Sequence, residues 1–108
     1  MTRQARAGAG EAVFRDVNER VAEIDRAHGI PSTELASFLC ECAETTCLAR
    51  VALPIAEYER IRASATWFVL LPGHEQPELE RVVEQADGYV VVQKHGEAAD
   101  VARERDPR

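Results

Sequence analysis

Large apolar residues recur with helical spacing early in the chain. Four of them, three, four and three positions apart, form one stripe of an α-helix: Phe14, Val17, Val21 and Ile24. Gly29 is a suitable C-terminal stop, and Pro31 follows just beyond it. We therefore expect a helix over residues 11–28 whose stripe packs on a sheet of the same chain. The spacing is also heptad-like, so a partner helix is the alternative occupant of this stripe.

The two ends of the chain differ from this pattern. Residues 1–10 contain Gly, Ala and Arg but no large apolar residue apart from Met1, which predicts a disordered arm. Residues 105–108 are expected to form a polar tail. The part between them, 11–104, has a length that suits one small domain with one core.

Residues 32–43 allow two interpretations. Ser32 could cap a helix with an apolar face formed by Leu35, Phe38, Leu39 and Cys42. In a strand, Phe38, Cys40 and Cys42 would alternate onto one face instead. Residues two apart on a helix are separated by about 200°, so only an extended chain lets both cysteines face the same way. We favour the strand.

The middle of the chain predicts a hairpin followed by a helix. A turn at 44–46 leads into a returning strand over 47–53, and Pro54 suits the first turn of the helix that follows. Its inward residues are expected to be Ile55, Tyr58 and Ile61. The charged residues of the same helix are expected to point outward, and they are Glu57, Glu59, Arg60 and Arg62.

The last third is rich in β-branched residues. The run at 66–71 (TWFVLL) predicts a buried strand that ends at Pro72-Gly73. Asp87-Gly88 between valine-rich flanks favours a hairpin with strands at 79–85 and 89–94, although 77–86 also fits a helix. A short helix over 96–106 follows. The fold class is thus α+β: a small antiparallel sheet of about four or five strands, an N-terminal helix and one or two short helices.

The charge and composition of the chain argue against some classes of function. The chain has 108 residues, is 45% hydrophobic and carries a formal net charge of −6, which argues against a general affinity for nucleic-acid phosphates. No apolar run is long enough to span a membrane, and the first residues lack the apolar core of a signal peptide. We expect a cytoplasmic protein that does not bind membranes.

The three cysteines, Cys40, Cys42 and Cys47, lie within eight positions of one another. An odd number cannot pair completely within one chain, and a reducing cytoplasm disfavours disulfides. Packing of small apolar thiols in the core is the simplest explanation for such a cluster. The alternatives, in which the cysteines would have a function, are metal binding and thiol redox chemistry.

Thiolates and imidazole are the ligands that Zn²⁺ prefers in structural sites, where four protein ligands form a closed tetrahedron. Cys40, Cys42 and Cys47 supply three, and His74, which follows the Pro-Gly break, is the first choice for the fourth, ahead of His95 and His28. Glu75 could orient His74, although an ordinary surface carboxylate is the simpler interpretation. Because the chain has only seven Phe, Trp, Tyr and Met residues, a zinc staple would add to a small core.

Recognised catalytic patterns are missing. The sequence has no H-E-x-x-H, no P-loop, no G-x-G-x-x-G and no C-x-x-C, and the P-C-x-x-C half of the zinc deaminase pattern is absent as well. No two glutamates are placed by the sequence as an acid/base pair. We therefore expect a protein without catalysis of its own.

Several segments together resemble a group of small actinobacterial proteins over about residues 13–108. The matching stretches are FRDVNERVAEI, FLCEC with a third Cys after it, AEYERIR, PGHE, YVVVQK and a final DPR. The resemblance implies no particular reaction. It implies that FLCEC and PGHE belong to one pattern, which favours His74 over His95, and that the protein is bacterial and cytoplasmic.

Three functions follow as hypotheses. The first is a small zinc-binding interaction or regulatory domain whose partner is another protein. The second is a thiol- or metal-responsive sensor in which Cys40 or Cys47 is a reversible ligand. The third is a nucleic-acid-binding zinc domain with a local basic patch formed by Arg50, Arg60 and Arg62.

Overall fold

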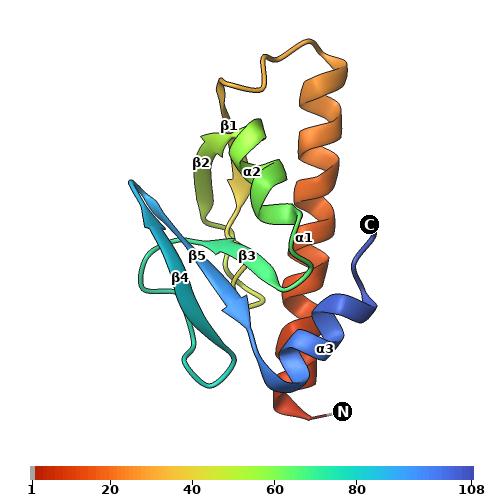
Figure 1. The fold of residues 1–108 in the computed structure, drawn as a ribbon, viewed down its shortest axis with the longest axis vertical. Helices are drawn as coiled ribbons and strands as arrows, with labels where there is room; N and C mark the ends of the chain where they lie inside the picture. The colour runs from red at the N-terminus through yellow and green to blue at the C-terminus, as the bar shows by residue number, and fades with distance from the viewer. Residues whose placement is uncertain (1) are drawn as a thin grey trace.

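The computed structural model describes residues 2–108 and has an α+β fold with one long helix, two short helices and five strands. The long helix α1 (Arg3–Ala27) lies along one side of the strands, and α3 packs across its N-terminal half (Figure 1). Within the described residues, no helix has the length and apolarity needed to cross a membrane.

Helix α1 begins at Arg3, so the prediction of a disordered arm over 1–10 was wrong for the residues that the structure describes. The Thr2 hydroxyl caps the helix by accepting a hydrogen bond from the Ala5 N–H at 3.1 Å. A Cβ built on Gly8 would lie 3.3 Å from the Cα of Ala98, so α1 and α3 approach closely at this point. The small residues that suggested disorder are therefore used for helix packing.

The face that α1 buries also differs from the prediction. Val17 and Ile24 of the predicted stripe are 41% and 55% exposed, whereas Phe14 and Val21 are half-buried and Val21 packs against the core. The buried residues of α1 lie on another side of the helix, and they are Gly8, Glu11, Ala12, Arg15, Asn18 and Ala22. Polar groups on that side find partners in distant segments, and the hydrophobic pattern alone could not reveal those partners.

The first sheet is a hairpin of β1 (Leu35–Leu39) and β2 (Arg50–Pro54), in which Phe38 lies opposite Val51. The strand interpretation therefore holds for Leu35–Leu39, but the strand ends before Cys40 and β2 begins only at Arg50. All three cysteines thus lie in the loop between the two strands. The N–H of Cys40 donates to the carbonyl of Ala49 at 2.9 Å, which closes the base of that loop.

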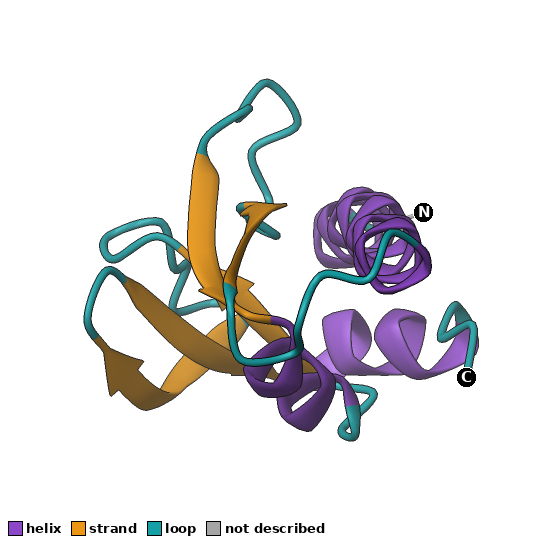
Figure 2. Cartoon of the chain, turned by 90° about the horizontal axis from the view of Figure 1, so that it is seen from above, coloured by secondary structure: helices purple, strands orange, loops and turns teal. Residues whose placement is uncertain are grey.

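The second sheet has the order β3-β5-β4 and is antiparallel throughout. Figure 2 shows the strands of the fold, in orange, to one side of the long helix. Its strands are β3 (Trp67–Leu70), β4 (Glu80–Ala86) and β5 (Tyr89–Lys94). The predicted β4–β5 hairpin is confirmed: Ala86 lies opposite Tyr89, and Gly88 supplies the positive φ of 88° that the turn requires. Instead of the single predicted sheet, the strands thus form two sheets.

Two short helices complete the fold, α2 (Ile55–Arg62) and α3 (Gly96–Glu104). On α2, the predicted inward residues are buried, and the ring of Tyr58 stacks on that of Phe38 at a centroid distance of 4.3 Å. Arg62 was predicted to point outward but is buried, because it pairs with Glu19 at 2.9 Å and Asp106 at 2.7 Å. The last residues are thereby held against the domain.

Candidate metal centre

Two loops carry the four residues that the sequence analysis proposed as ligands. Cys40 and Cys42 follow directly after β1, and Cys47 lies in the turn before β2. The turn is fixed by Glu44, whose carbonyl accepts from the Cys47 N–H at 3.0 Å. His74 lies between β3 and β4, just after Gly73, whose φ of 90° allows the sharp turn.

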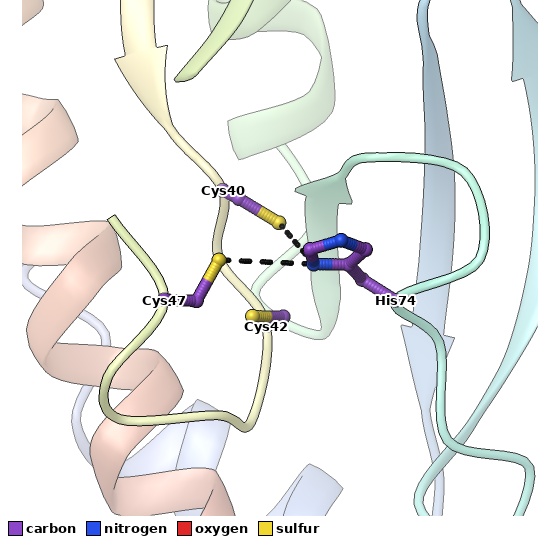
Figure 3. A group of neighbouring side chains, drawn as sticks. All are labelled: Cys40, Cys42, Cys47 and His74. Carbon is purple, nitrogen blue, oxygen red and sulfur yellow. Dashed lines mark hydrogen bonds between the residues drawn. The ribbon is translucent and has the colours of Figure 1, made fainter. Parts of the chain in front are cut away.

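These four side chains meet at one point, which we call the Cys/His corner. The Sγ atoms of Cys40, Cys42 and Cys47 and a ring nitrogen of His74 all lie within 4.8 Å of one another. His74 Nδ1 is 3.6 Å from the Sγ of Cys40 and 3.7 Å from the Sγ of Cys47 (Figure 3).

This spacing matches the size of a tetrahedral zinc site. With Zn–S bonds of about 2.3 Å and a Zn–N bond of about 2.0–2.1 Å, ligands at tetrahedral angles lie about 3.6 Å apart for S···N and about 3.8 Å apart for S···S. The two S···N distances at His74 agree with the first of these values. The four residues therefore lie close enough to hold a metal ion, and the donor set is compatible with zinc.

The buried thiols need a nearby positive charge in order to ionise near neutral pH. Burial raises the pKa of the Cys40 thiol, and the hydrogen bond from the Leu71 N–H only partly opposes it. Burial also raises the pKa of Cys42. Buried thiols of this kind stay protonated near neutral pH unless a positive charge compensates the thiolates. The Leu71 N–H, 3.2 Å from the Sγ of Cys40, is already directed at that sulfur.

Glu41, between two of the cysteines, anchors the corner to the rest of the fold. Its Oε2 accepts from the Tyr58 hydroxyl at 2.6 Å and from Asn18 Nδ2 at 2.8 Å, and its Oε1 accepts from the Val69 N–H at 3.0 Å. The backbone N–H of Glu41 donates to the Val69 carbonyl at 2.9 Å. Glu41 thus pairs with both backbone groups of Val69 and joins the two sheets.

Burial raises the pKa of Glu41, whereas the hydrogen bonds from Tyr58, Asn18 and Val69 oppose this rise. All of these bonds are donated to the carboxylate, so they fit its ionised form. Glu41 could not be identified as a site residue from the sequence, because alternation along an extended segment over residues 38–42 places it on the face opposite to the cysteines. The only feature of the sequence that could have indicated Glu41 is its position as a charged residue between two close cysteines.

The remaining candidates from the sequence, Glu75, His95 and His28, form their hydrogen bonds with backbone groups outside the Cys/His corner. Glu75 accepts from the Gly73 N–H at 2.9 Å, so it stabilises the turn before His74 instead of orienting the imidazole. His95 lies against the Pro77 carbonyl at 3.2 Å, and His28 lies 2.8 Å from the Ile24 carbonyl. Neither belongs to the group that could share an ion.

A second polar site lies inside the fold, and the sequence analysis missed it. Lys94 pairs with Glu11 and Glu80, and the side chains of all three are fully buried. We call these three residues the ion cluster. Burial lowers the pKa of Lys94 and raises the pKa of Glu80 to about 7. The Lys94 ammonium also lies 4.9 Å from the centroid of the Phe68 ring.

Comparisons of the chain with protein families, with curated proteins and with solved structures give no match. The arguments about its function therefore rest on the geometry of these sites.

Proposed function

We propose that the protein is a small zinc-binding interaction or regulatory domain, in which Cys40, Cys42, Cys47 and His74 hold one Zn²⁺ and no catalysis takes place. The observation that supports this proposal is the convergence of three sulfurs and one imidazole nitrogen within 4.8 Å. These ligands come from two loops that are some thirty positions apart in the sequence.

The donor set favours a structural role for the metal. Four protein ligands complete the tetrahedron that zinc adopts in structural sites, whereas catalytic sites keep one position open for water or substrate. Three thiolates and one Zn²⁺ also leave a net charge of −1, which reduces the ability of the ion to acidify water. Both features favour a site that holds loops together.

Zinc at this position would connect the two sheets of the domain. The loop between β1 and β2 supplies the cysteines, and the loop between β3 and β4 supplies His74. Structural zinc sites in small peptides bind with on the order of 10–16 kcal/mol, and this energy becomes folding energy because the unfolded chain lacks the site. Within this proposal, a reducing cytoplasm would keep the thiols available for the metal.

Zinc content of mutant proteins tests the proposal directly. Native mass spectrometry should find one zinc per chain in the wild-type protein, and Cys42→Ser and His74→Ala should each lose it. His28→Ala is the matched control, because this exposed histidine lies outside the corner and its loss should leave the zinc in place. A fully folded wild-type protein that carries no metal after purification and does not take up added zinc would refute the proposal.

A sensor is the second candidate, and it is supported by the exposure of one ligand. Cys47 is only partly buried, whereas Cys40 and Cys42 are 1% and 2% exposed. Peroxide could therefore reach Cys47 first. The thiolates of Cys47 and Cys42 would lose two electrons to form a disulfide, peroxide would take up these electrons and two protons to give two waters, and zinc would be released. Zinc retained during mild peroxide treatment would exclude this function.

The nucleic-acid hypothesis gains no support from the arginines on which it was based. Arg62 is buried against Glu19 and Asp106, and Arg60 pairs with Glu57 and Glu84. The charges of Arg60 and Arg62 are therefore compensated within the domain. We do not extend the proposal to DNA or RNA.

A further inference from the structure

Helix α1 leaves one apolar stripe, formed by Val13, Val17 and Ile24, exposed on its outer side. Val13 and Ile24 are each 55% exposed and Val17 is 41% exposed. A surface helix ordinarily directs such a stripe toward the core of its own domain. The three residues, at positions i, i+4 and i+11, lie along one side of the helix over about 16 Å, at about 1.5 Å per residue.

Specific contacts of the opposite face fix this orientation. Arg15 donates to the carbonyls of Ala65 and Ala102 at 2.6 and 2.9 Å, and Glu11 pairs with the buried Lys94. Asn18 exchanges two hydrogen bonds with the backbone of Leu39, at 2.7 and 2.9 Å. Rotating α1 to bury the apolar stripe would break all of these contacts, so the stripe is available to a partner.

Among the elements that the structure describes in residues 2–108, none covers the stripe. Figure 2, which looks along α1, shows the sheets and α2 on one side of the helix and α3 on another, and Figure 1 shows the outer side of α1 open along its upper half. We call the residues Val13, Asp16, Val17, Arg20 and Ile24 the outer face of α1; all five are exposed.

The charges on the outer face lack partners within residues 2–108. Asp16 and Arg20 form no ion pair there, whereas Glu11, Glu19 and Arg26, which point toward the domain, all do. Because Asp16 and Arg20 have opposite signs and flank the apolar stripe, the face can complement itself. If a second α1 runs antiparallel, with the twofold axis level with position 18, Arg20 lies opposite Asp16 of the second copy, and Val13 comes within one residue of the level of its Ile24.

We propose that the outer face of α1 is a self-association surface that binds a second copy of this chain through an antiparallel pair of α1 helices. The metal ligands take no part in it, so this inference does not depend on the zinc proposal. A helix pair of about three turns buries less than the roughly 1,200–2,000 Å² of a standard stable interface. The dimer should therefore be weak and should form at high protein concentration.

Sedimentation equilibrium of the full chain from low micromolar to millimolar concentration tests this inference. The wild-type protein should shift from monomer to dimer, and Val17→Glu and Ile24→Glu should remain monomeric with an unchanged circular dichroism spectrum. The matched control is Val82→Glu on β4, which is 36% exposed and lies outside the outer face, and it should dimerise like wild type. A wild-type protein that stays monomeric at millimolar concentration would overturn the proposal, as would dimers that survive both α1 substitutions.

A charge exchange tests the antiparallel register. Asp16→Arg and Arg20→Asp alone should each place like charges opposite each other and weaken the dimer at least several-fold. The double variant restores opposite charges and should return to nearly wild-type association. A double variant weaker than both single variants would contradict the proposed pairing. Measuring zinc content on the same samples separates this result from the metal proposal, since all of these variants should carry as much zinc as wild type.

Discussion

The Cys/His corner and the ion cluster bring acidic groups into the interior in two different ways. In the ion cluster, the chain provides its own cation, because Lys94 pairs with Glu11 and Glu80. In the Cys/His corner, three thiols meet one imidazole, and a single imidazolium would compensate at most one of three thiolates. The ion cluster thus contains its own cation, whereas under the zinc proposal the Cys/His corner would take its cation from solution. Stability should depend on metal at the corner only.

The largest expected effect is that of metal removal. A strong chelator should lower the thermal midpoint of the wild-type protein by more than about 10 °C. The midpoint of a domain of this size shifts by about 4–8 °C for each kcal/mol of stability, and zinc binding should contribute several kcal/mol. Differential scanning calorimetry with and without chelator measures this shift. Cys42→Ala should unfold near the midpoint of the chelated wild type and should not respond to chelator. Equal midpoints for wild type with and without chelator would remove the distinction between the two sites.

Removing the internal cation should have the next largest effect. Lys94→Met leaves two buried carboxylates unpaired, which should lower the free energy of unfolding by about 3–5 kcal/mol. Urea denaturation measures the loss, and zinc content should remain that of wild type. The triple variant with Glu11→Gln and Glu80→Gln added should recover much of the stability, since no charge then remains buried. A Lys94→Met protein as stable as wild type would mean that these carboxylates are not ionised.

Glu41 connects the corner to the core, and its substitution should have an intermediate effect. Glu41→Gln turns an amide N–H toward either Val69 N–H or Asn18 Nδ2, so one donor loses its acceptor. We expect a loss of about 2–3 kcal/mol in the free energy of unfolding. Tyr58→Phe, which removes a single donor, should cost less. Urea denaturation of the zinc-loaded variants checks this order. A Glu41→Gln variant as stable as wild type would show that Glu41 is protonated in the fold.

The smallest expected effect concerns the ion pair between Asp106 and Arg62 near the C-terminus. Burial opposes ionisation of Asp106, but hydrogen bonds from the Arg108 N–H and from Arg62 outweigh it and lower the pKa of Asp106. Its contribution should therefore be present above the unfolded value of about 3.8 and be lost as pH falls through the lower folded pKa. Asp106→Asn should cost about 1 kcal/mol at neutral pH.

This difference between wild type and Asp106→Asn should shrink below pH 4, which urea titrations at several pH values would detect. A difference that stays constant down to the lowest pH at which both proteins fold would argue against the Asp106–Arg62 pair. Arg103→Ala is a control, because the exposed pair that Arg103 forms with Asp100 should contribute little at any pH.

The sequence predicted the features that depend on local chemistry. Asp87-Gly88 determined the β4–β5 hairpin, and Gly29 fits the end of α1, which stops two residues earlier. The alternation of Cys40 and Cys42 in an extended segment, together with the Pro-Gly break before His74, was sufficient to propose four residues that the fold brings together. Short-range rules apply to the hairpin and to the end of α1 because the neighbours that matter there are close in sequence. His74 lies some thirty positions from the cysteines and was instead proposed from its chemistry as a zinc ligand.

The features that the sequence could not reveal depend on partners far away along the chain. Arg15 is buried because of carbonyls at positions 65 and 102, and Glu11 is buried because of Lys94. A search for apolar stripes cannot find such pairs, and it therefore predicted burial for Val17 and Ile24, which are exposed. The same limit applies to Glu41, whose donors come from α1, α2 and β3.

X-ray absorption at the zinc edge of the purified protein tests the central claim most directly. The account predicts a first coordination shell of three sulfurs at about 2.3 Å and one nitrogen at about 2.0–2.1 Å. His74→Ala should replace or remove the nitrogen while the sulfurs remain. A shell dominated by oxygen and nitrogen, or a zinc signal that persists unchanged in Cys42→Ser, would contradict zinc binding at the Cys/His corner.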